Sequence, residues 1–311
     1  MNELRPKVSV IIPTYNRAVY VGDAIRSVQA QTHGNVEIIV ADDGSTDETP
    51  TLVAGFGDAV TYLALPHTGQ PAAARNSGLD EATGPFIAFL DSDDLFMPGK
   101  LAWQLYALEL HPQAALVYSD GSYFRDDPGR PTGRLLKGLP TPSGDVLSEL
   151  LRGNFLVSPA MLLLRRSCLE EVGPFDEDPD LWLSEDYELW LRIAARFPIV
   201  YAPGNVASVR RHTESLSRDV ATLRARALVA LRKLEDRYPQ AVHQRGAAIN
   251  EGYARNHGAI AATLWGERKL LPAARHSLHA LRYSLRTPGL GTVAFGEWIR
   301  RRRVRGTGAR P

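Results

Sequence analysis

Short apolar runs alternate with amphipathic segments over the N-terminal part of the chain. Runs with the length and composition of buried strands occur at Val8 to Ile12, Val36 to Ala41, Val60 to Ala64 and Phe86 to Leu90. Residues 19–31 and 72–82 have the spacing of helices, and Ser45 with Glu48 has the spacing of a capping box that would start another. The order β-α-β-α-β-α-β predicts an α/β fold with a doubly wound, mostly parallel sheet and helices on both faces.

Polar side chains follow three of the four predicted strands. They form the segments Pro13-Thr14-Tyr15-Asn16, Asp42-Asp43-Gly44-Ser45 and Asp91-Ser92-Asp93-Asp94. Because the carboxyl ends of parallel strands meet at one edge of a sheet, the three segments are expected to converge on a ligand crevice. The three carboxylates of the last segment repel one another, which favours a bound divalent cation such as Mg2+ or Mn2+ held through oxygen ligands.

Several classes of protein are disfavoured by composition and motifs. The chain has 311 residues with 36 basic and 35 acidic side chains. Its charges nearly cancel, so it lacks the strong positive electrostatic field that would indicate a nucleic-acid partner. The first strand is followed neither by a dinucleotide-binding glycine fingerprint nor by a P-loop. Cys168 is the single cysteine, which excludes an internal disulfide and fits a reducing cytosol; we expect it to be a small buried residue.

The C-terminal part of the chain has a different pattern. Long segments rich in alanine, leucine and arginine predict helices at 221–238, 241–265 and 272–285. We therefore expect an α/β domain at 1–217 and a helical extension with a basic tail at 218–311. No secretory signal and no stretch near the ~20 apolar residues of a membrane span is present, which predicts a cytoplasmic protein. The basic tail Trp298 to Arg305 suggests peripheral contact with the anionic inner face of the plasma membrane, the alternative being a solvated, frayed terminus.

Four segments together carry a family resemblance. In their order and spacing they resemble the nucleotide-sugar glycosyltransferases of family 2, which have the GT-A fold: Val8 to Arg17, Asp42 to Asp47, Ala73 to Gly78 and Phe89 to Asp94. The resemblance covers about Lys7 to Leu216. It implies an enzyme whose donor is a nucleotide sugar.

The resemblance assigns the donor side of the site. Thr14 and Tyr15, within the segment Pro13 to Asn16, would line the base and ribose, and Asp43 would accept a hydrogen bond from the base ring. Arg75 would reach the nucleotide or its phosphates with its guanidinium fork. The structural alternatives are strand-end packing for Tyr15, an Asp-Gly turn for Asp43 and an ordinary helix arginine for Arg75.

The acidic segment resembles the Asp-X-Asp motif of metal-dependent glycosyltransferases. This implies that Asp93 is a direct metal ligand and that Asp91 binds the ribose or the metal shell, with Ser92 among the donor-binding residues. The cation would neutralise the leaving diphosphate. His212 would complete the metal shell or touch the diphosphate, or be only structural. Asp94 is left without a role.

Glu185 and Asp186 match the Glu-Asp motif of the family. The resemblance implies that Asp186 is the general base for the acceptor hydroxyl, with Glu185 as the second choice or its orienting partner. The structural alternative is acid in the first turn of a helix. Gly173 to Asp176 would shape the acceptor-side loop.

We therefore expect an inverting, metal-dependent hexosyltransferase. Its donor would be a UDP-sugar, or a dTDP- or GDP-sugar, and its acceptor a hydroxyl of a growing glycan, glycolipid or lipid-linked polysaccharide precursor of the cell envelope. Two alternatives remain at this point: a catalytically inactive nucleotide-sugar-binding protein, and a nucleotidyltransferase, although the glycine-rich loop usual in the latter is missing.

Overall fold

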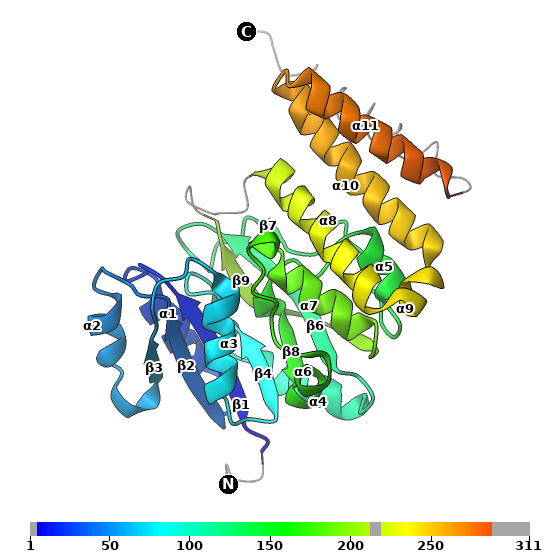
Figure 1. The fold of residues 1–311 in the computed structure, drawn as a ribbon. Coiled ribbons are helices and arrows are strands. Elements are labelled where there is room, and N and C mark those ends of the chain that lie inside the picture. The colour runs from blue at the N-terminus through cyan, green and yellow to red at the C-terminus, as the bar shows by residue number, and fades with distance from the viewer. Residues whose placement is uncertain (1–4, 212–218, 288–311) are drawn as a thin grey trace. The chain divides into compact units, whose positions relative to one another are not determined.

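The computed structural model describes residues 5–211 and 219–287 (Figure 1). The chain divides into two compact units. Unit 1 comprises Met1–Val146 and Phe155–Ser215, and unit 2 comprises Leu147–Asn154 and Leu216–Pro311. The segment Leu147–Asn154 groups with the C-terminal helices, which no pattern in the sequence indicated.

Unit 1 is built on one sheet. Its strands are β1 (Val8–Thr14), β2 (Val36–Asp42), β3 (Thr61–Ala64), β4 (Phe86–Phe89), β5 (Leu95–Phe96), β6 (Leu116–Phe124), β7 (Gly133–Arg134), β8 (Leu162–Arg165) and β9 (Ile199–Arg210). The spatial order is β3-β2-β1-β4-β8-β6-β9-β5, with β7 paired to β6. The neighbours among β3, β2, β1 and β4 are parallel, as predicted. Beyond β4 the sheet is mixed, because β8 pairs antiparallel with both β4 and β6.

Helices cover both faces of this sheet, which confirms the predicted α/β architecture. Those of unit 1 are α1 (Val21–Gln29), α2 (Thr49–Ala54), α3 (Pro71–Glu81), α4 (Lys100–Leu110), α6 (Arg166–Val172) and α7 (Glu185–Ala194). On one face of β1, Val10 and Ile12 share an apolar core with Ile25 of α1 and Leu101 of α4. On the other face α3 approaches closely, since a Cβ on its Gly78 would lie 2.5 Å from Cγ2 of Ile11. Both faces of β1 are therefore buried, and its carboxyl end is fixed from two sides.

The prediction that Ser45 and Glu48 form a capping box for α2 is wrong. The helix begins at Thr49, its N-cap is Glu48, and no side chain caps it. The Ser45 hydroxyl instead accepts a hydrogen bond of 2.8 Å from the backbone N–H of Asn16. Ser45 thus joins two strand-end loops, and this contact competes with helix capping.

Unit 2 is helical, as predicted for the C-terminal extension. It contains α5 (Leu147–Arg152), α8 (Val220–Arg237), α9 (Pro239–His243), α10 (Gly246–Gly266) and α11 (Leu270–Leu285). Helix α10 packs tightly on α5, because a Cβ on Gly252 would lie 2.0 Å from the carbonyl oxygen of Leu151. Among the described helices, none combines the length and hydropathy needed to cross a bilayer. The basic tail at 298–305 lies outside the described residues.

Candidate active site

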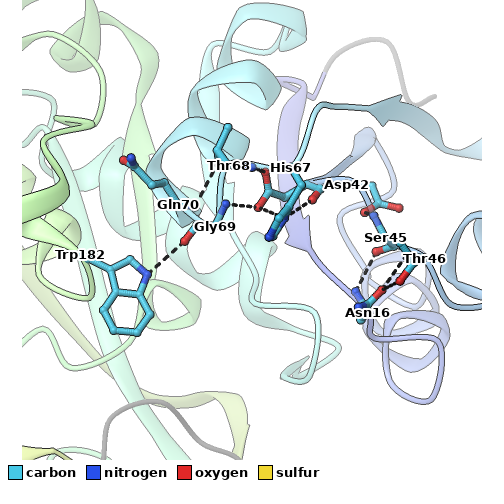
Figure 2. A network of polar contacts seen from close by, with 10 residues as sticks. Asn16, Asp42, Ser45, Thr46, His67, Thr68, Gly69, Gln70 and Trp182 are labelled. Carbon is cyan, nitrogen blue, oxygen red and sulfur yellow. Dashed lines mark hydrogen bonds and ion pairs between the residues drawn. The ribbon is translucent and has the colours of Figure 1, made fainter.

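The loops after β1 and β2 are tied together by side chain to backbone hydrogen bonds (Figure 2). Asn16 has a left-handed backbone with φ of 49°, and its Oδ1 accepts from the N–H groups of Thr46 at 2.8 Å and Asp47 at 3.3 Å. Asp42 accepts from the N–H of Ser45 at 2.9 Å. Asparagine tolerates the left-handed conformation better than most residues, so Asn16 can turn the chain and hold the second loop at once. Its carboxamide oxygen is already used within the protein.

Asp43 organises the loop that follows β3. Its carboxylate accepts from the N–H and hydroxyl of Thr68 at 2.8 and 2.9 Å and from the N–H of Gly69 at 2.8 Å. The Nδ1 atom of His67 lies 3.0 Å from the same carboxylate. The His67 ring in turn stacks on Tyr15, with centroids 4.1 Å apart and planes inclined by 18°. The two rings are half-exposed, and they form an aromatic surface beside the ends of β1 and β2.

Two further donor-side residues lie at the end of β1. Pro13 pairs in register with Ala41 of β2, and Thr14 is the last residue of the strand. Thr14 is buried, and its hydroxyl has no hydrogen-bond partner among the described residues. A buried hydroxyl without a partner is costly unless another group supplies the bond.

Arg75 joins the two acidic segments that the sequence separates widely. Its Nη2 donates to Asp91 at 2.9 Å and its Nη1 to Glu185 at 2.6 Å, across 16 and 110 residues of sequence. We call Arg75, Asp91 and Glu185 the Arg75 junction. Burial disfavours the charge on Arg75, yet the two carboxylates more than offset this and raise its pKa. The guanidinium also lies over the ring of Phe175, 5.5 Å from its centroid.

Two polar atoms of the Arg75 junction lack a hydrogen-bond partner among the described residues. They are Nε of Arg75 and Oε2 of Glu185, and both are buried. Both guanidinium termini predicted to grip phosphate are engaged by carboxylates here. A phosphate contact by Arg75 would therefore need its Nε or an exchange of partners.

Asp186 directly follows Glu185, the last residue of the Arg75 junction, in the sequence. It is the second residue of α7, and its Oδ1 accepts from the N–H of Tyr187 at 2.6 Å. Burial and the neighbouring Glu185 carboxylate raise the pKa of Asp186 to about 7, although Arg75 opposes the shift. A carboxyl group that titrates near neutral pH can both accept and release a proton under ordinary conditions.

The remaining carboxylates of the acidic segment have separate environments. Asp91 is about one third exposed, with 36% of its side-chain surface accessible, whereas Ser92 and Asp94 are buried. Asp94 accepts from the backbone N–H of Arg210 at 2.9 Å, and Nε of Arg210 donates to the carbonyl of Asp93 at 3.1 Å. Burial, followed by repulsion from Asp93 and Asp91, raises the pKa of Asp94 well above its usual value. Asp94, for which the sequence suggested no role, anchors the end of β9 to this loop.

The loop at 173–176, which was predicted to lie on the acceptor side, is held by residues that were not assigned from the sequence. Asn76 donates to the carbonyl of Phe175 at 2.9 Å and accepts from its N–H at 2.9 Å. Arg192 forms a buried ion pair with Glu188 at 2.8 Å and donates to the carbonyls of residues 172–174. Trp182 donates to the carbonyl of Gly69 at 3.2 Å (Figure 2). The position of Asn76 directly after Arg75 was the available signal, but its partners lie about 100 residues away.

The described residues bring most of the predicted site together at one edge of the sheet. Among residues 5–211 and 219–287, no three His, Cys, Asp or Glu side chains are arranged as a metal site. His212, one of the predicted metal ligands, lies outside those residues. Asp91 and Asp93 nevertheless fit a hard divalent cation chemically. Their mutual repulsion with Asp94 favours a cation, and Mg2+ is often held by one or two carboxylates together with substrate phosphates.

A hollow lies at the opposite edge of unit 1. Its volume is about 480 Å3, and Lys7, Glu37 and Asp58 are among its lining residues. It is at the amino ends of β1 and β2, whereas ligands of open α/β sheets bind beyond the carboxyl ends. The geometry therefore favours the edge that holds the Arg75 junction.

Comparison with known proteins decides the family. The model of glycosyl transferase family 2 matches residues 9–173, more than half of the chain. The chain belongs to glycosyl transferase family 2. The match includes the loops after β1, β2 and β4 as well as Arg75, and it confirms the resemblance seen in the sequence.

Relatives within the family are themselves named glycosyltransferases. The chain is 33% identical over 228 residues to an uncharacterized glycosyltransferase of Rickettsia felis, which covers 71% of this chain and 37% of the relative. Over 101 residues it is 43% identical to the GalNAc(5)-diNAcBac-PP-undecaprenol beta-1,3-glucosyltransferase of Campylobacter jejuni, covering 31% of this chain and 33% of that protein. The chain thus spans about a third of the length of these two curated relatives.

Solved structures confirm the GT-A-type fold of this family member. TarS residues 1–349 of S. aureus, crystallised with UDP-GlcNAc, match with a TM-score of 0.69 and 19% identity over 91% of this chain and 82% of that one. The mannosyltransferase PcManGT of Pyrobaculum calidifontis, in complex with GDP-Man and Mn2+, matches with a TM-score of 0.53 and 20% identity over 91% and 86%. At these identities the likeness concerns the fold.

Proposed function

We propose that the protein is an inverting glycosyltransferase that moves a sugar from a nucleoside diphosphate to an acceptor hydroxyl. The observation that carries this proposal is the Arg75 junction. It sets Glu185, and with it Asp186 at the start of α7, beside the acidic strand end at Asp91. Family membership supports glycosyl transfer in general; the roles below rest on the geometry.

Asp186 acts as the general base. Its carboxylate takes the proton of the acceptor hydroxyl, the oxygen attacks C1 of the donor sugar, and the bond from C1 to the diphosphate oxygen breaks. The electron pair of that bond leaves with the nucleoside diphosphate, and attack from the opposite face inverts C1. A pKa near 7 suits this task, because a base is most effective when its pKa lies near the working pH.

Glu185 positions the base. Its Oε1 is held by Arg75 and its side chain is buried, so it is poorly placed to exchange protons with an acceptor. Its negative charge keeps the pKa of Asp186 high. We therefore assign the proton transfer to Asp186 and the tuning of its pKa to Glu185.

Asp93, with Asp91 beside it, would hold a divalent cation, Mg2+ or Mn2+. When bound, the cation would neutralise the growing charge on the diphosphate as a Lewis acid. The Mn2+ and GDP-Man in the PcManGT structure support both the metal and the donor class. His212 remains a predicted further ligand.

The nucleotide base would lie against Tyr15 and His67. Their stacked, half-exposed rings offer an aromatic face next to Thr14, whose hydroxyl lacks a partner within the described residues. We propose UDP as the nucleotide, with dTDP and GDP as alternatives; the UDP-GlcNAc complex of TarS supports this choice. Asp43 contributes by fixing the His67 loop, and a contact with the base ring would be additional.

The acceptor would be a glycan, glycolipid or lipid-linked polysaccharide precursor of the cell envelope. The support is the name of the Campylobacter jejuni relative, which acts on a PP-undecaprenol-linked glycan. We propose that the enzyme works on the cytoplasmic side of the membrane, with peripheral contact through its basic tail. The catalytic domain would be the family-like part of the chain, 1–217.

The test compares Asp186→Asn with Asp58→Asn, an exposed carboxylate in the short 3-10 helix Gly57–Ala59 that precedes β3. Donor screening by released nucleoside diphosphate identifies the substrate, and calorimetry then measures UDP binding with and without Mn2+ or Mg2+. Asp186→Asn should abolish transfer and leave metal-dependent UDP binding intact, while Asp58→Asn behaves as wild type. Near-normal turnover in Asp186→Asn would refute the base assignment. Metal-independent UDP binding without transfer in the wild type would favour an inactive binding protein.

A further inference from the structure

Unit 2 contains a cavity rich in basic and aromatic side chains. Its volume is about 380 Å3, within the range of small-molecule sites. It lies among α8, α10 and α11 and is lined by Ala225, Leu228, Arg232, Tyr253, His257, Arg275, His276, His279 and Tyr283. The lining contains two arginines and three histidines but no aspartate or glutamate. This composition is unusual for a packing defect between helices, which would be apolar.

The histidines contact one another directly. Nδ1 of His257 lies 2.9 Å from Nδ1 of His276, so one of the two nitrogens must carry the proton that the other accepts. The ring of His279 stacks on His257 with centroids 4.9 Å apart. On the same side of α10, Tyr253 and Tyr283 stack at 4.7 Å. The result is an ordered aromatic wall, and within the described residues the Nε2 atoms of His257 and His276 form no hydrogen bond.

The charges around this wall disfavour a cation. Burial, then His276, His279 and Arg232, lower the pKa of His257 to about 4. Burial, His279 and Arg275 lower the pKa of His276. Glu235 of α8 accepts a hydrogen bond from the Tyr253 hydroxyl and is not part of the lining. Within the described part of the chain, these histidines do not form a metal-binding group either.

We propose that this cavity binds a phosphoryl group, as phosphate or diphosphate. Arg232 and Arg275 are exposed at its rim, where their guanidinium forks can grip phosphate oxygens. The imidazoles of His257, His276 and His279 form its inner wall and donate further hydrogen bonds to the anion. The bound anion favours protonation of His257 and His276, so binding should strengthen as the pH falls.

The source of the phosphoryl group is either a soluble phosphate or a phosphate carried on a lipid. Helix α11 also exposes Leu271, Leu278, Leu281 and Leu285, at the 7-3-4 spacing of a single helix face. If the phosphate belongs to a lipid, these leucines would contact the apolar chains of that lipid. The proposal concerns unit 2 alone and does not depend on the catalytic assignments.

The experiment follows the histidine imidazole resonances of the full chain by NMR, with divalent metals chelated. Pyrophosphate should shift the resonances of His257, His276 and His279, assigned by single His→Gln variants, and leave His111 of unit 1 unchanged. Arg275→Gln should weaken binding about tenfold, as expected for loss of one charge-assisted contact. The matched control is Arg282→Gln, an exposed arginine of the same helix outside the lining, which should bind as wild type.

Sulfate provides the pH test, because it does not titrate near neutrality. Because the pKa values of His257 and His276 are lowered, its affinity should rise as the pH is lowered from about 7 to about 5. A short-chain phosphatidic acid that binds more tightly than pyrophosphate would identify a lipid-borne phosphate, and equal affinity a soluble one; both results support the proposal. Absence of shifts with either ligand, equal losses in Arg275→Gln and Arg282→Gln, or a pH-independent sulfate affinity would overturn it.

Discussion

The pKa of Asp186 should be adjustable through the residue that precedes it. Substitution of Glu185 by glutamine removes a negative charge next to the proposed base while keeping a similar shape. Because that charge is the second largest contribution raising the pKa of Asp186, after burial, the pKa should fall. The proposed base acts in its ionised form, so the acidic limb of the pH–rate profile should move to lower pH.

The size of this shift can be bounded with Coulomb's law. If the two carboxylates are taken to be about 5 Å apart, they interact by about 3 kcal/mol at an effective dielectric constant of about 20, which corresponds to about two pKa units. Arg75, bound to Glu185 at 2.6 Å, neutralises part of that field. The raised pKa of Asp186 predicts a wild-type limb near pH 7, and we expect Glu185→Gln to move it down by about one unit.

Arg75→Gln should have the opposite effect on the same profile. Arg75 lowers the pKa of Asp186 and also pairs with Glu185, so its loss moves the limb to higher pH. It should also destabilise unit 1 by about 3–5 kcal/mol, because Glu185 is then left as a buried, unpaired carboxylate. The Glu185→Gln variant keeps a neutral partner for Arg75 and should lose less stability.

The assay measures kcat/KM from the release of nucleoside diphosphate over about pH 5.5 to 9, at a saturating metal concentration. Opposite shifts in Glu185→Gln and Arg75→Gln are the expected result. Identical profiles in all three proteins, or a Glu185→Gln limb at higher pH than wild type, would refute the tuning role. Loss of all activity in Glu185→Gln with normal UDP binding would instead make Glu185 the base.

Three further predictions concern the surroundings of the base. Asp94 has a raised pKa when folded, so its carboxyl stabilises the fold below the unfolded pKa and this contribution is lost as the pH rises through the folded value. At neutral pH without metal, Asp94→Asn should therefore be at least as stable as wild type in urea unfolding, whereas Asp94→Ala should lose about 1–3 kcal/mol because the N–H of Arg210 loses its acceptor. Chelation of divalent metal should abolish transfer, and Mn2+ or Mg2+ should restore it in wild type but not in Asp93→Asn; full activity in chelator would contradict the metal assignment. Tyr15→Leu should weaken UDP binding about fivefold by calorimetry, while Tyr106→Leu on the exposed face of α4 should not, and equal affinities would remove Tyr15 from the base site.

The fold was predictable where the signal was local. Buried strands such as β1 and β4 follow from continuous apolar runs, and the helices between them follow from their spacing. The antiparallel pairing of β8 between β4 and β6 did not follow, because strand order depends on packing between segments that are far apart in sequence. The same holds for α5, which is short and takes its place in unit 2 through the close approach of Gly252 to Leu151.

The site shows the same division between local and distant contacts. The acidic residues could be identified as candidates because each follows a strand or opens a helix. Their partners could not be identified: Arg75 meets Glu185 across 110 residues, and Asp94 meets Arg210 across 116. The prediction of a capping box was wrong for a related reason. The Ser45 hydroxyl accepts from the backbone N–H of Asn16, which is 29 residues away in the sequence.

These distant contacts explain how one edge of a sheet can hold so many carboxylates. Arg210 donates to Asp94 through its backbone and lies beside Asp93, while Arg75 neutralises both Asp91 and Glu185. Each arginine therefore joins the acidic strand end to an element that comes much later in the chain. Asp186 also feels the field of Arg75, yet its pKa stays near neutrality because burial and Glu185 outweigh that cation. We infer that a site arranged in this way separates two tasks of its carboxylates: those held by arginines position the loops, and Asp186, whose pKa lies near neutrality, exchanges a proton.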